Sequence, residues 1–170
     1  FAVLVGIDHL DWHDIQETRR VLQATSTNSV YAGTGEQANI ASARLAFALD
    51  LRGPSINFNT ACSSALVAAY SGMLTLRSAH CTGALFAGTR ALLLPFLLGT
   101  LHAKDGRCKS FDARADGYGR SEGVGAIHLA RSGILVISGS AVRAGGRSAS
   151  LTAPNGSSMA NTIRSALQDA

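Results

Sequence analysis

The sequence predicts an α/β fold with a mostly parallel central sheet and helices on its faces. Three observations support this prediction. The first seven residues, FAVLVGI, form a continuous apolar run with β-branched side chains, which is typical of a buried strand. Strand-like and helix-like segments then alternate through the first half of the 170-residue chain. Hydrophobic residues make up 46% of the chain and charged residues 15%, which indicates a globular protein rather than a disordered one.

The first half of the chain contains the elements that build this sheet. SINFN (55–59) alternates Ile56 and Phe58 with polar residues and therefore predicts a strand. Pro54 ends the preceding helix, because proline cannot continue one. The predicted elements are a polar helix or loop at 8–23, a short strand at 29–33, a helix at 34–51, the strand at 55–59 and a helix at 63–79.

The second half of the chain favours an antiparallel addition to the sheet. Two apolar segments follow each other with only Arg131 and Ser132 between them, which predicts two strands joined by a tight turn. Ser157 or Ser158 can cap a final helix, whose apolar residues recur at helical spacing. The predicted elements are a strand at 84–88, a long ordered loop at 101–125, strands at 124–130 and 133–144, and a helix containing Met159, Ile163 and Leu167.

Composition and charge disfavour two classes of function. The net charge is +4, no block of five or more Lys and Arg occurs, and the aromatic content is 6%, so the chain does not look like a nucleic-acid-binding protein. The most apolar segment, residues 83–101, is interrupted by Arg90 and Pro95. We therefore expect it to form buried core rather than a transmembrane helix, and we expect no membrane association.

The cysteines and the chain ends indicate the setting of the protein. Cys62, Cys81 and Cys108 are odd in number and include no CxxC pair, which disfavours both a disulfide framework and a zinc site. We expect reduced thiols and a cytoplasmic location. The chain starts at Phe1 without an initiator Met and stops at Ala170 within a predicted helix, so we expect it to be part of a longer polypeptide.

Cys62 is the candidate nucleophile. It follows a two-residue corner between the strand at 55–59 and the helix at 63–79, which places it beside the first turn of that helix. Unpaired N–H groups and the helix dipole stabilise a thiolate there, and the same N–H groups can hold an oxyanion. No Asp or Glu occurs between Asp50 and Asp105. The alternative is that Cys62 is a buried spacer, and the local pattern leaves both interpretations open.

Five ordered segments resemble the ketosynthase domain of type I polyketide synthases, a β-ketoacyl synthase of the thiolase-like superfamily. TACSSALVA resembles the active-site segment of that family, and Cys62 stands at the position of the family's cysteine. The other four segments are VYAGTG (30–35), ASARLAFALDLRGPS (41–55), DGRCKSFDARADGYGRSEG (105–123) and GSAVRAGGRSASLTAPNG (139–156).

The resemblance implies a specific fold and activity. It implies the thiolase-like layered fold, incomplete here, with residues 1–170 forming part of one ketosynthase domain that acts as a homodimer. Cys62 then accepts an acyl chain from an acyl carrier protein and condenses it with a malonyl-type extender through decarboxylative Claisen chemistry. The phosphopantetheine arm of the carrier protein arrives as part of the substrate, and no metal or other cofactor is implied. A fatty-acid synthase condensing enzyme is the near alternative.

The two catalytic histidines of the family are expected beyond Ala170. They follow the LTAPNG-type segment, so the chain alone is expected to lack condensing activity. None of the five histidines present matches their motifs, and we assign no catalytic role to His9, His13, His80, His102 or His128. Arg90 and Arg143 stand where the family commonly has Asn. A homologue that binds acyl chains without condensing them remains an alternative.

Three short motifs offer other functions. GRSEG fits the nucleophile elbow of serine hydrolases, with Ser121 as nucleophile, but that elbow requires a strand before it and a helix after it. GTGEQA (33–38) fits a dinucleotide-binding turn, but the next predicted strand lacks the acidic residue that binds ribose. HLDWH places His9 and His13 four residues apart without the glutamate of a zinc hydrolase.

Two charged segments are expected to be surface features. A solvated acidic surface is the better interpretation of the residues around His13, namely Asp8, Asp11 and Asp14. The loop at 101–125 carries both signs of charge, so we expect it to pair internally rather than to form an anion-binding patch. Its charged residues are Lys104, Arg107, Lys109, Arg114, Arg120, Asp105, Asp112, Asp116 and Glu122.

Overall fold

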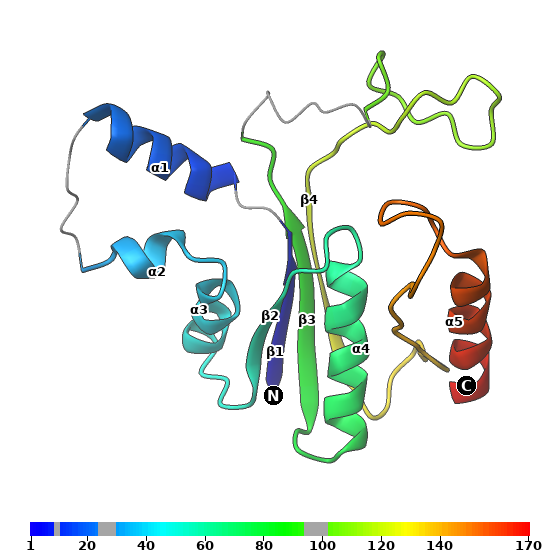
Figure 1. Ribbon diagram of the computed structural model, residues 1–170. Coiled ribbons are helices and arrows are strands. Elements are labelled where there is room, and N and C mark those ends of the chain that lie inside the picture. Colours follow the sequence, from blue (N-terminus) through cyan, green and yellow to red (C-terminus); the bar gives the residue numbers. More distant parts are fainter. Residues whose placement is uncertain (9–10, 24–29, 94–101) are drawn as a thin grey trace.

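A mixed four-stranded sheet lies at the centre of the protein (Figure 1). The computed structural model describes residues 1–8, 11–23, 30–93 and 102–170. The strand order is β2-β1-β3-β4, in which β1 pairs in parallel with β2 and β3, and β4 pairs antiparallel with β3. The strands are β1 (Ala2–Ile7), β2 (Ser55–Phe58), β3 (Gly83–Arg90) and β4 (Gly123–Ala130). The predicted α/β class, with a mostly parallel sheet and an antiparallel addition, is confirmed.

Helices cover the two faces of the parallel strands. Leu4 of β1 is fully buried in a cluster with Ala68 and Leu76 of α4 (Ser64–Arg77). Val5, on the opposite face of β1, packs in a second cluster with Leu45 of α3 (Ile40–Ala48). Successive side chains of a strand alternate between faces, so the continuous apolar run of β1 supplies both clusters.

The remaining helices lie outside these two layers. Helix α1 (Asp11–Gln23) and the short α2 (Ala32–Glu36) lie beyond the carboxyl ends of the parallel strands, and α5 (Gly156–Asp169) stands beside α4 (Figure 1). An ion pair joins the two neighbours, from Arg77 Nη1 in α4 to Asp169 Oδ1 in α5, at 2.5 Å. This pair lowers the pKa of Asp169, with a further contribution from the Ser140 amide, which donates to the same carboxylate.

Polar side chains hold α3 against the edge strand β2. Asn57 donates to the carbonyl of Asn39 at 2.7 Å and to Ser42 Oγ at 2.9 Å. Ser42 is 1% exposed and also accepts from the Ser55 hydroxyl at 2.9 Å. These bonds satisfy the polar groups of a buried serine, which would otherwise be costly to bury.

Two predicted strands are wrong. Val30 and Tyr31, in the described part of segment 29–33, form a turn that leads into α2, because the Tyr31 carbonyl accepts from Gly35 N at 2.8 Å. Residues 133–144 form no strand, although their sequence is apolar. A strand requires a neighbouring backbone to pair with, and in the described part of the chain the sheet ends at β4.

The helix ends differ in detail from those predicted. Residues 34–51 contain the end of α2 and the shorter α3 rather than one helix. Asn155, not Ser157 or Ser158, caps α5, since its side chain accepts from the Ser158 amide at 3.1 Å. The prediction that 8–23 holds a polar helix or loop is confirmed by α1.

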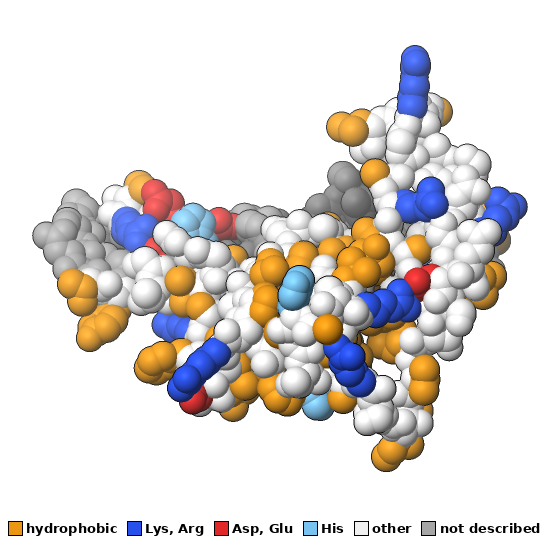
Figure 2. All heavy atoms as spheres, turned by 90° about the horizontal axis from the view of Figure 1, so that it is seen from below, with side chains coloured by type: hydrophobic (Ala, Val, Ile, Leu, Met, Phe, Trp, Pro, Cys, Tyr) orange, Lys and Arg blue, Asp and Glu red, His pale blue; other side chains and the backbone are white. Residues whose placement is uncertain are grey.

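Apolar side chains remain exposed over the C-terminal part of the chain. Val124 and Ile127 of β4 are 80% and 55% exposed, and no residue of α5 is buried. Figure 2 views the molecule from the end at which β1 begins and shows hydrophobic side chains gathered near the middle of that surface. Among the described residues, no helix combines the length and hydrophobicity that a membrane span requires.

Candidate active site

Cys62 lies on a sharp turn between β2 and α4. Thr60 and Cys62 form an isolated bridge on either side of Ala61, whose φ of 52° is in the left-handed region. Alanine rarely adopts this conformation, because its Cβ approaches the following carbonyl. The turn leaves Cys62 exposed and unpaired with another cysteine. The prediction of a strand, a corner and a helix around Cys62 is therefore confirmed, whereas its alternative as a buried spacer is not supported.

Serine hydroxyls after Cys62 hold this turn. Ser64 Oγ accepts from the Thr60 amide at 2.8 Å and donates to the Ala61 carbonyl at 2.7 Å. Ser63 Oγ donates to the Thr60 carbonyl at 2.8 Å. Asn59 contributes from the other side, because its side chain accepts from the Ala61 amide at 3.3 Å. The peptide groups around Ala61 are thus bonded locally.

Two glycines bring the first turn of α4 close to the sheet. Gly6 of β1 and Gly88 of β3 are registered partners. A Cβ on Gly6 would lie 2.4 Å from the backbone N of Ala65, and one on Gly88 would lie 2.7 Å from the Ala65 Cβ. Only glycine permits this approach. We call this pair the glycine seat. It fixes the helix end beside Cys62.

The position of Cys62 suits nucleophilic chemistry. The thiol precedes Ser63, the N-cap of α4, at the end of the helix that carries partial positive charge. Such an end stabilises a thiolate, which is the nucleophilic form of cysteine, and an oxyanion formed on a neighbouring carbonyl. The site also lies at the carboxyl edge of the parallel strands, where α/β folds commonly place their active sites.

The sequence did not predict an ion pair that lies at this edge. Arg90 Nη1 lies 3.0 Å from Asp8 Oδ2, although the two residues are 82 positions apart. Arg90 is the last residue of β3, and Asp8 directly follows the last residue of β1, so the pair joins the carboxyl ends of two parallel strands. Sequence neighbours of Cys62 lack carboxylates, but Asp8 approaches this edge from β1. The pair could have been inferred from the parallel pairing expected of the two apolar strands, now β1 and β3, because that pairing brings their carboxyl ends together.

The acidic residues around α1 are not all solvated. Asp11 is 1% exposed, and its Oδ2 accepts from the Leu93 amide at 2.9 Å. The expected acidic surface is therefore wrong for Asp11, because its carboxylate binds the backbone that follows β3. Asp8 and Asp14 instead line a cleft of about 430 Å³ whose residues are mostly polar, together with His13, Glu36, Gln37, Ala38, Asn39 and Asn59.

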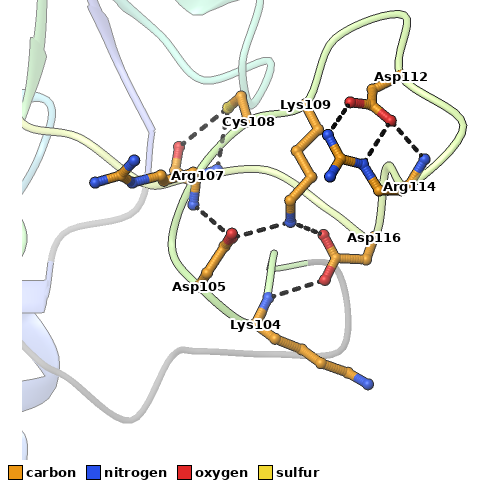
Figure 3. Close-up of polar contacts among 9 residues, drawn as sticks. Lys104, Asp105, Arg107, Cys108, Lys109, Asp112, Arg114 and Asp116 are labelled. Carbon is orange, nitrogen blue, oxygen red and sulfur yellow. Dashed lines mark hydrogen bonds and ion pairs between the residues drawn. The ribbon is translucent and has the colours of Figure 1, made fainter.

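The charged loop between residues 102 and 122 pairs with itself, as predicted (Figure 3). Lys109 Nζ lies 3.0 Å from Asp105 and 2.6 Å from Asp116. Its hydrogen bonds, first to Asp116 and then to Asp105, raise the pKa of Lys109. The same bonds lower the pKa of both carboxyl groups. Arg114 likewise pairs with Asp112 and lowers its pKa.

The other cysteines have structural environments. Cys81 is buried in the cluster beneath α4. Cys108 is exposed, and its sulfur accepts from the Gly119 amide at 3.1 Å, which ties the two ends of the charged loop (Figure 3). All three thiols are free.

The hydrolase, dinucleotide-binding and zinc motifs do not lie in the secondary structure that these functions require. Ser121 lies in the loop that leads into strand β4, so no helix follows it as the hydrolase elbow requires. GTGEQA begins within helix α2 rather than after a strand. His9 lies outside the described residues, and His13 is exposed on α1. In the described part of the chain, no group of three or more His, Cys, Asp or Glu residues is placed to hold a metal ion.

Comparisons with known proteins agree on one family. Residues 1–133 match the family model of the β-ketoacyl synthase N-terminal domain. The chain is 40% identical over 165 residues to polyketide synthase GfsE of Streptomyces halstedii, covering 89% of this chain and 4% of that protein. It is 41% identical over 154 residues to the phenolphthiocerol synthesis polyketide synthase Pks15/1 of Mycobacterium bovis, covering 82% of this chain and 7% of that protein.

Solved structures give the same result. The oxazolomycin ketosynthase domain OzmH KS7 of Streptomyces albus JA3453 matches with a TM-score of 0.86 at 25% identity, over 99% of this chain and 31% of that one. A ketosynthase from module 6 of the bacillaene synthase of Bacillus subtilis 168 matches with a TM-score of 0.82 at 27% identity, over 98% of this chain and 29% of that one. The chain thus spans less than a third of these ketosynthases.

Proposed function

Because this chain belongs to the β-ketoacyl synthase family, we propose that the protein containing it is the ketosynthase of a polyketide synthase, with Cys62 as its nucleophile. The observation that carries the proposal is the exposed thiol of Cys62 on a left-handed turn at the amino end of α4. The reaction class is acyl transfer followed by decarboxylative Claisen condensation.

In the first step, the Cys62 thiolate attacks the carbonyl carbon of an acyl thioester. A carbon–sulfur bond to Cys62 forms, and the carbonyl oxygen becomes an oxyanion. The backbone N–H of Cys62, beside the positive end of the α4 dipole, is suited to stabilise this charge. The oxyanion then collapses, the bond to the donor's sulfur breaks, and the donor leaves as a thiolate that takes up a proton.

In the second step, the acyl-Cys62 thioester is the electrophile. A malonyl-type extender loses carbon dioxide, and the electron pair of the broken bond forms a carbon–carbon bond to the acyl carbonyl. The Cys62 thiolate is the leaving group, which regenerates the enzyme. The family's two histidines assist the decarboxylation, and none of the five histidines of this chain takes that role.

The partners follow from this chemistry. The donor thiol is the phosphopantetheine arm of an acyl carrier protein, which acts as substrate, so the protein needs no metal or redox cofactor of its own. We further propose that the complete domain is a cytoplasmic homodimer. A condensing enzyme of fatty acid biosynthesis uses the same steps and would differ in the acyl chains that it accepts.

The proposal is tested by acylation of Cys62 in the full-length polypeptide. Incubation with an acyl thioester should add one acyl mass to the peptide that contains Cys62, as measured by mass spectrometry. Cys62→Ala should abolish the adduct, whereas Cys108→Ala should keep it, because Cys108 lies in the loop and contacts Gly119. Undiminished acylation of Cys62→Ala would refute the role.

The same polypeptide separates the proposal from its alternatives. Acylation of Cys62 without carbon dioxide release from a malonyl thioester would indicate a homologue that binds acyl chains without condensing them. Labelling of Ser121 by a serine-directed phosphonate would indicate the hydrolase instead, although no structural feature favours it.

A further inference from the structure

Ser64 is the buried serine of the Cys62 turn. It is 4% exposed, and its hydroxyl makes two short bonds, one from the Thr60 amide at 2.8 Å and one to the Ala61 carbonyl at 2.7 Å. Its own amide donates to the same Ala61 carbonyl at 3.1 Å. A hydroxyl can donate one hydrogen bond and accept others, so both functions of this buried group are used within the turn.

These bonds span the one strained residue beside the thiol. The Thr60 amide precedes Ala61 and the Ala61 carbonyl follows it, so Ser64 holds the backbone on both sides of a residue with φ of 52°. A non-glycine residue keeps a left-handed conformation only where its surroundings determine it. Ala61 is bonded directly to Cys62, and a change in its φ and ψ would rotate the thiol relative to α4.

We propose that Ser64 is a positioning residue for Cys62, whose hydroxyl maintains the left-handed conformation of Ala61 and thereby the direction of the thiol. The inference rests on the proposed function, because it concerns the reactivity of the same nucleophile. Ser64 does not touch the substrate in this role, and it acts through Ala61.

The neighbouring Ser63 provides a matched control. Its hydroxyl also bonds within the turn, to the Thr60 carbonyl at 2.8 Å, which belongs to the peptide group before Ala61, and to the Thr60 hydroxyl at 2.9 Å, but it makes no bond to the Ala61 carbonyl. Ser63 also makes no side-chain cap bond to α4. Ser63→Ala therefore removes a hydroxyl from the same turn and releases one bond before Ala61, but it leaves both Ser64 bonds, to the Thr60 amide and the Ala61 carbonyl, in place.

The experiment compares Ser64→Ala, Ser63→Ala and the double variant Ala61→Gly/Ser64→Ala in the full-length polypeptide. Ser64→Ala should slow acylation of Cys62 at saturating thioester by at least about tenfold without changing KM for the donor, since only the attack geometry is altered. Ser63→Ala should stay within about threefold of the wild type. Glycine adopts positive φ without strain, so Ala61→Gly should restore most of the rate that Ser64→Ala loses.

A second readout does not depend on acyl transfer. Alkylation by iodoacetamide, followed by mass spectrometry, gives the rate at Cys62 relative to Cys108. Ser64→Ala should lower this ratio and Ala61→Gly should restore it, even if the wild type accepts no acyl group. A wild type that accepts no acyl group, combined with these changes in the alkylation ratio, would contradict the proposed function and leave the positioning role intact.

Clear results would overturn the inference. A wild-type acylation rate and alkylation ratio in Ser64→Ala would do so, as would a double variant as slow as the single one. If Ser64→Ala does not fold, Ser64→Cys keeps the volume of the side chain and a weaker hydrogen-bonding group. It should then show an intermediate rate, and a wild-type rate would equally reject the role.

Discussion

The part of the sheet around β1 and the part around β4 differ in how completely the chain covers them. A row of residues on one face crosses the sheet from Gly6 in β1 through Gly88 in β3 to Gly125 in β4. At Gly6 an added Cβ would meet the backbone of α4 at 2.4 Å, whereas at Gly125 it would meet nothing within 4 Å. Glycine thus permits close packing against α4 at Gly6, whereas Gly125 at the other end of the row faces open space.

A second row repeats the contrast with large side chains. Leu4 in β1 is fully buried, but Ile127, two strands away on β4, is 55% exposed. The covered side carries Cys62 and its turn, while the exposed side continues into residues 131–155 and α5. The nucleophile therefore rests on the part of the fold whose packing partners lie mainly within residues 1–90, with Leu129 of β4 added to the cluster beneath α4.

The largest expected effect is on the buried row. Leu4→Ala should lower the free energy of unfolding by about 2–5 kcal/mol, because it leaves a cavity between the sheet and α4. Ile127→Ala should cost less than about 1 kcal/mol in the same polypeptide, since the side chain is half exposed. Urea unfolding measures both. Equal losses would contradict the contrast between the two sides.

This contrast also explains how much of the fold the sequence could predict. The strands of the first seven residues and at 84–88 were predictable because their apolar patterns reflect packing on both faces, and the strand at 55–59 because Ile56 and Phe58 alternate with polar residues. The segment 133–144 has an equally apolar sequence, but strand formation depends on a partner strand, which a local pattern does not specify. The predicted strand at 29–33 failed because the Tyr31 carbonyl is bonded locally instead.

The candidate site was predictable to a similar extent. A cysteine between a strand and a helix indicated the position of Cys62 beside the amino end of α4. The sequence could not indicate the pair Asp8–Arg90, because its members meet only after β1 and β3 align. It also could not reveal the positive φ of Ala61, since alanine gives no signal for that conformation.

Substitutions in the row formed by Gly6, Gly88 and Gly125 test the difference between the covered and the exposed parts of the sheet. Gly6→Ala should destabilise the fold by about 1–3 kcal/mol, because the new methyl group forces α4 away from the sheet. It should also slow acylation of Cys62, whose turn precedes the displaced helix. Gly125→Ala is the matched control in the same row and should stay within about 0.5 kcal/mol of the wild type. Urea unfolding and the mass-spectrometric acylation assay give the two readings.

A smaller effect is expected on the exposed side. Helix α5 buries none of its residues, so its N-terminal cap should matter for its own stability rather than for the sheet. Asn155→Ala should cost α5 about 0.5–2 kcal/mol, seen as faster amide hydrogen exchange in residues 156–169. Asn155→Asp keeps the acceptor for the Ser158 amide and should exchange more slowly than the alanine variant. Faster exchange in β1 would contradict a local effect.

The smallest effect concerns the charged loop and depends on pH. Carboxyl groups with a lowered pKa stabilise the folded state above their ordinary value of 3.8, and this contribution is lost as the pH falls through the lowered pKa of Asp105 and Asp116. Lys109 has a raised pKa, so its contribution is present below 10.5 and is lost as the pH rises through the raised value. Order in the loop should therefore weaken only at these extremes.

Two variants measure this contribution at neutral pH. Lys109→Met removes the cation that joins Asp105 to Asp116 and should speed amide exchange at both ends of the loop. Arg114→Met removes only the local pair with Asp112, two residues away, and should affect fewer amides. Acylation of Cys62 should be unchanged in both. Identical exchange profiles would show that Lys109 does not link the loop.

The glycine seat also limits how α4 can move. Because Ala65 lies so close to Gly6 and Gly88 that neither glycine has room for a Cβ, α4 has no room to move toward the sheet. We therefore expect α4 to form a fixed wall behind Cys62 that an acyl chain of larger size would not displace. We expect any adaptation to come instead from the rim where α1 and α2 border the cleft, whose lining residues are mostly polar. Substitutions that broaden substrate range should therefore accumulate on that rim and spare α4.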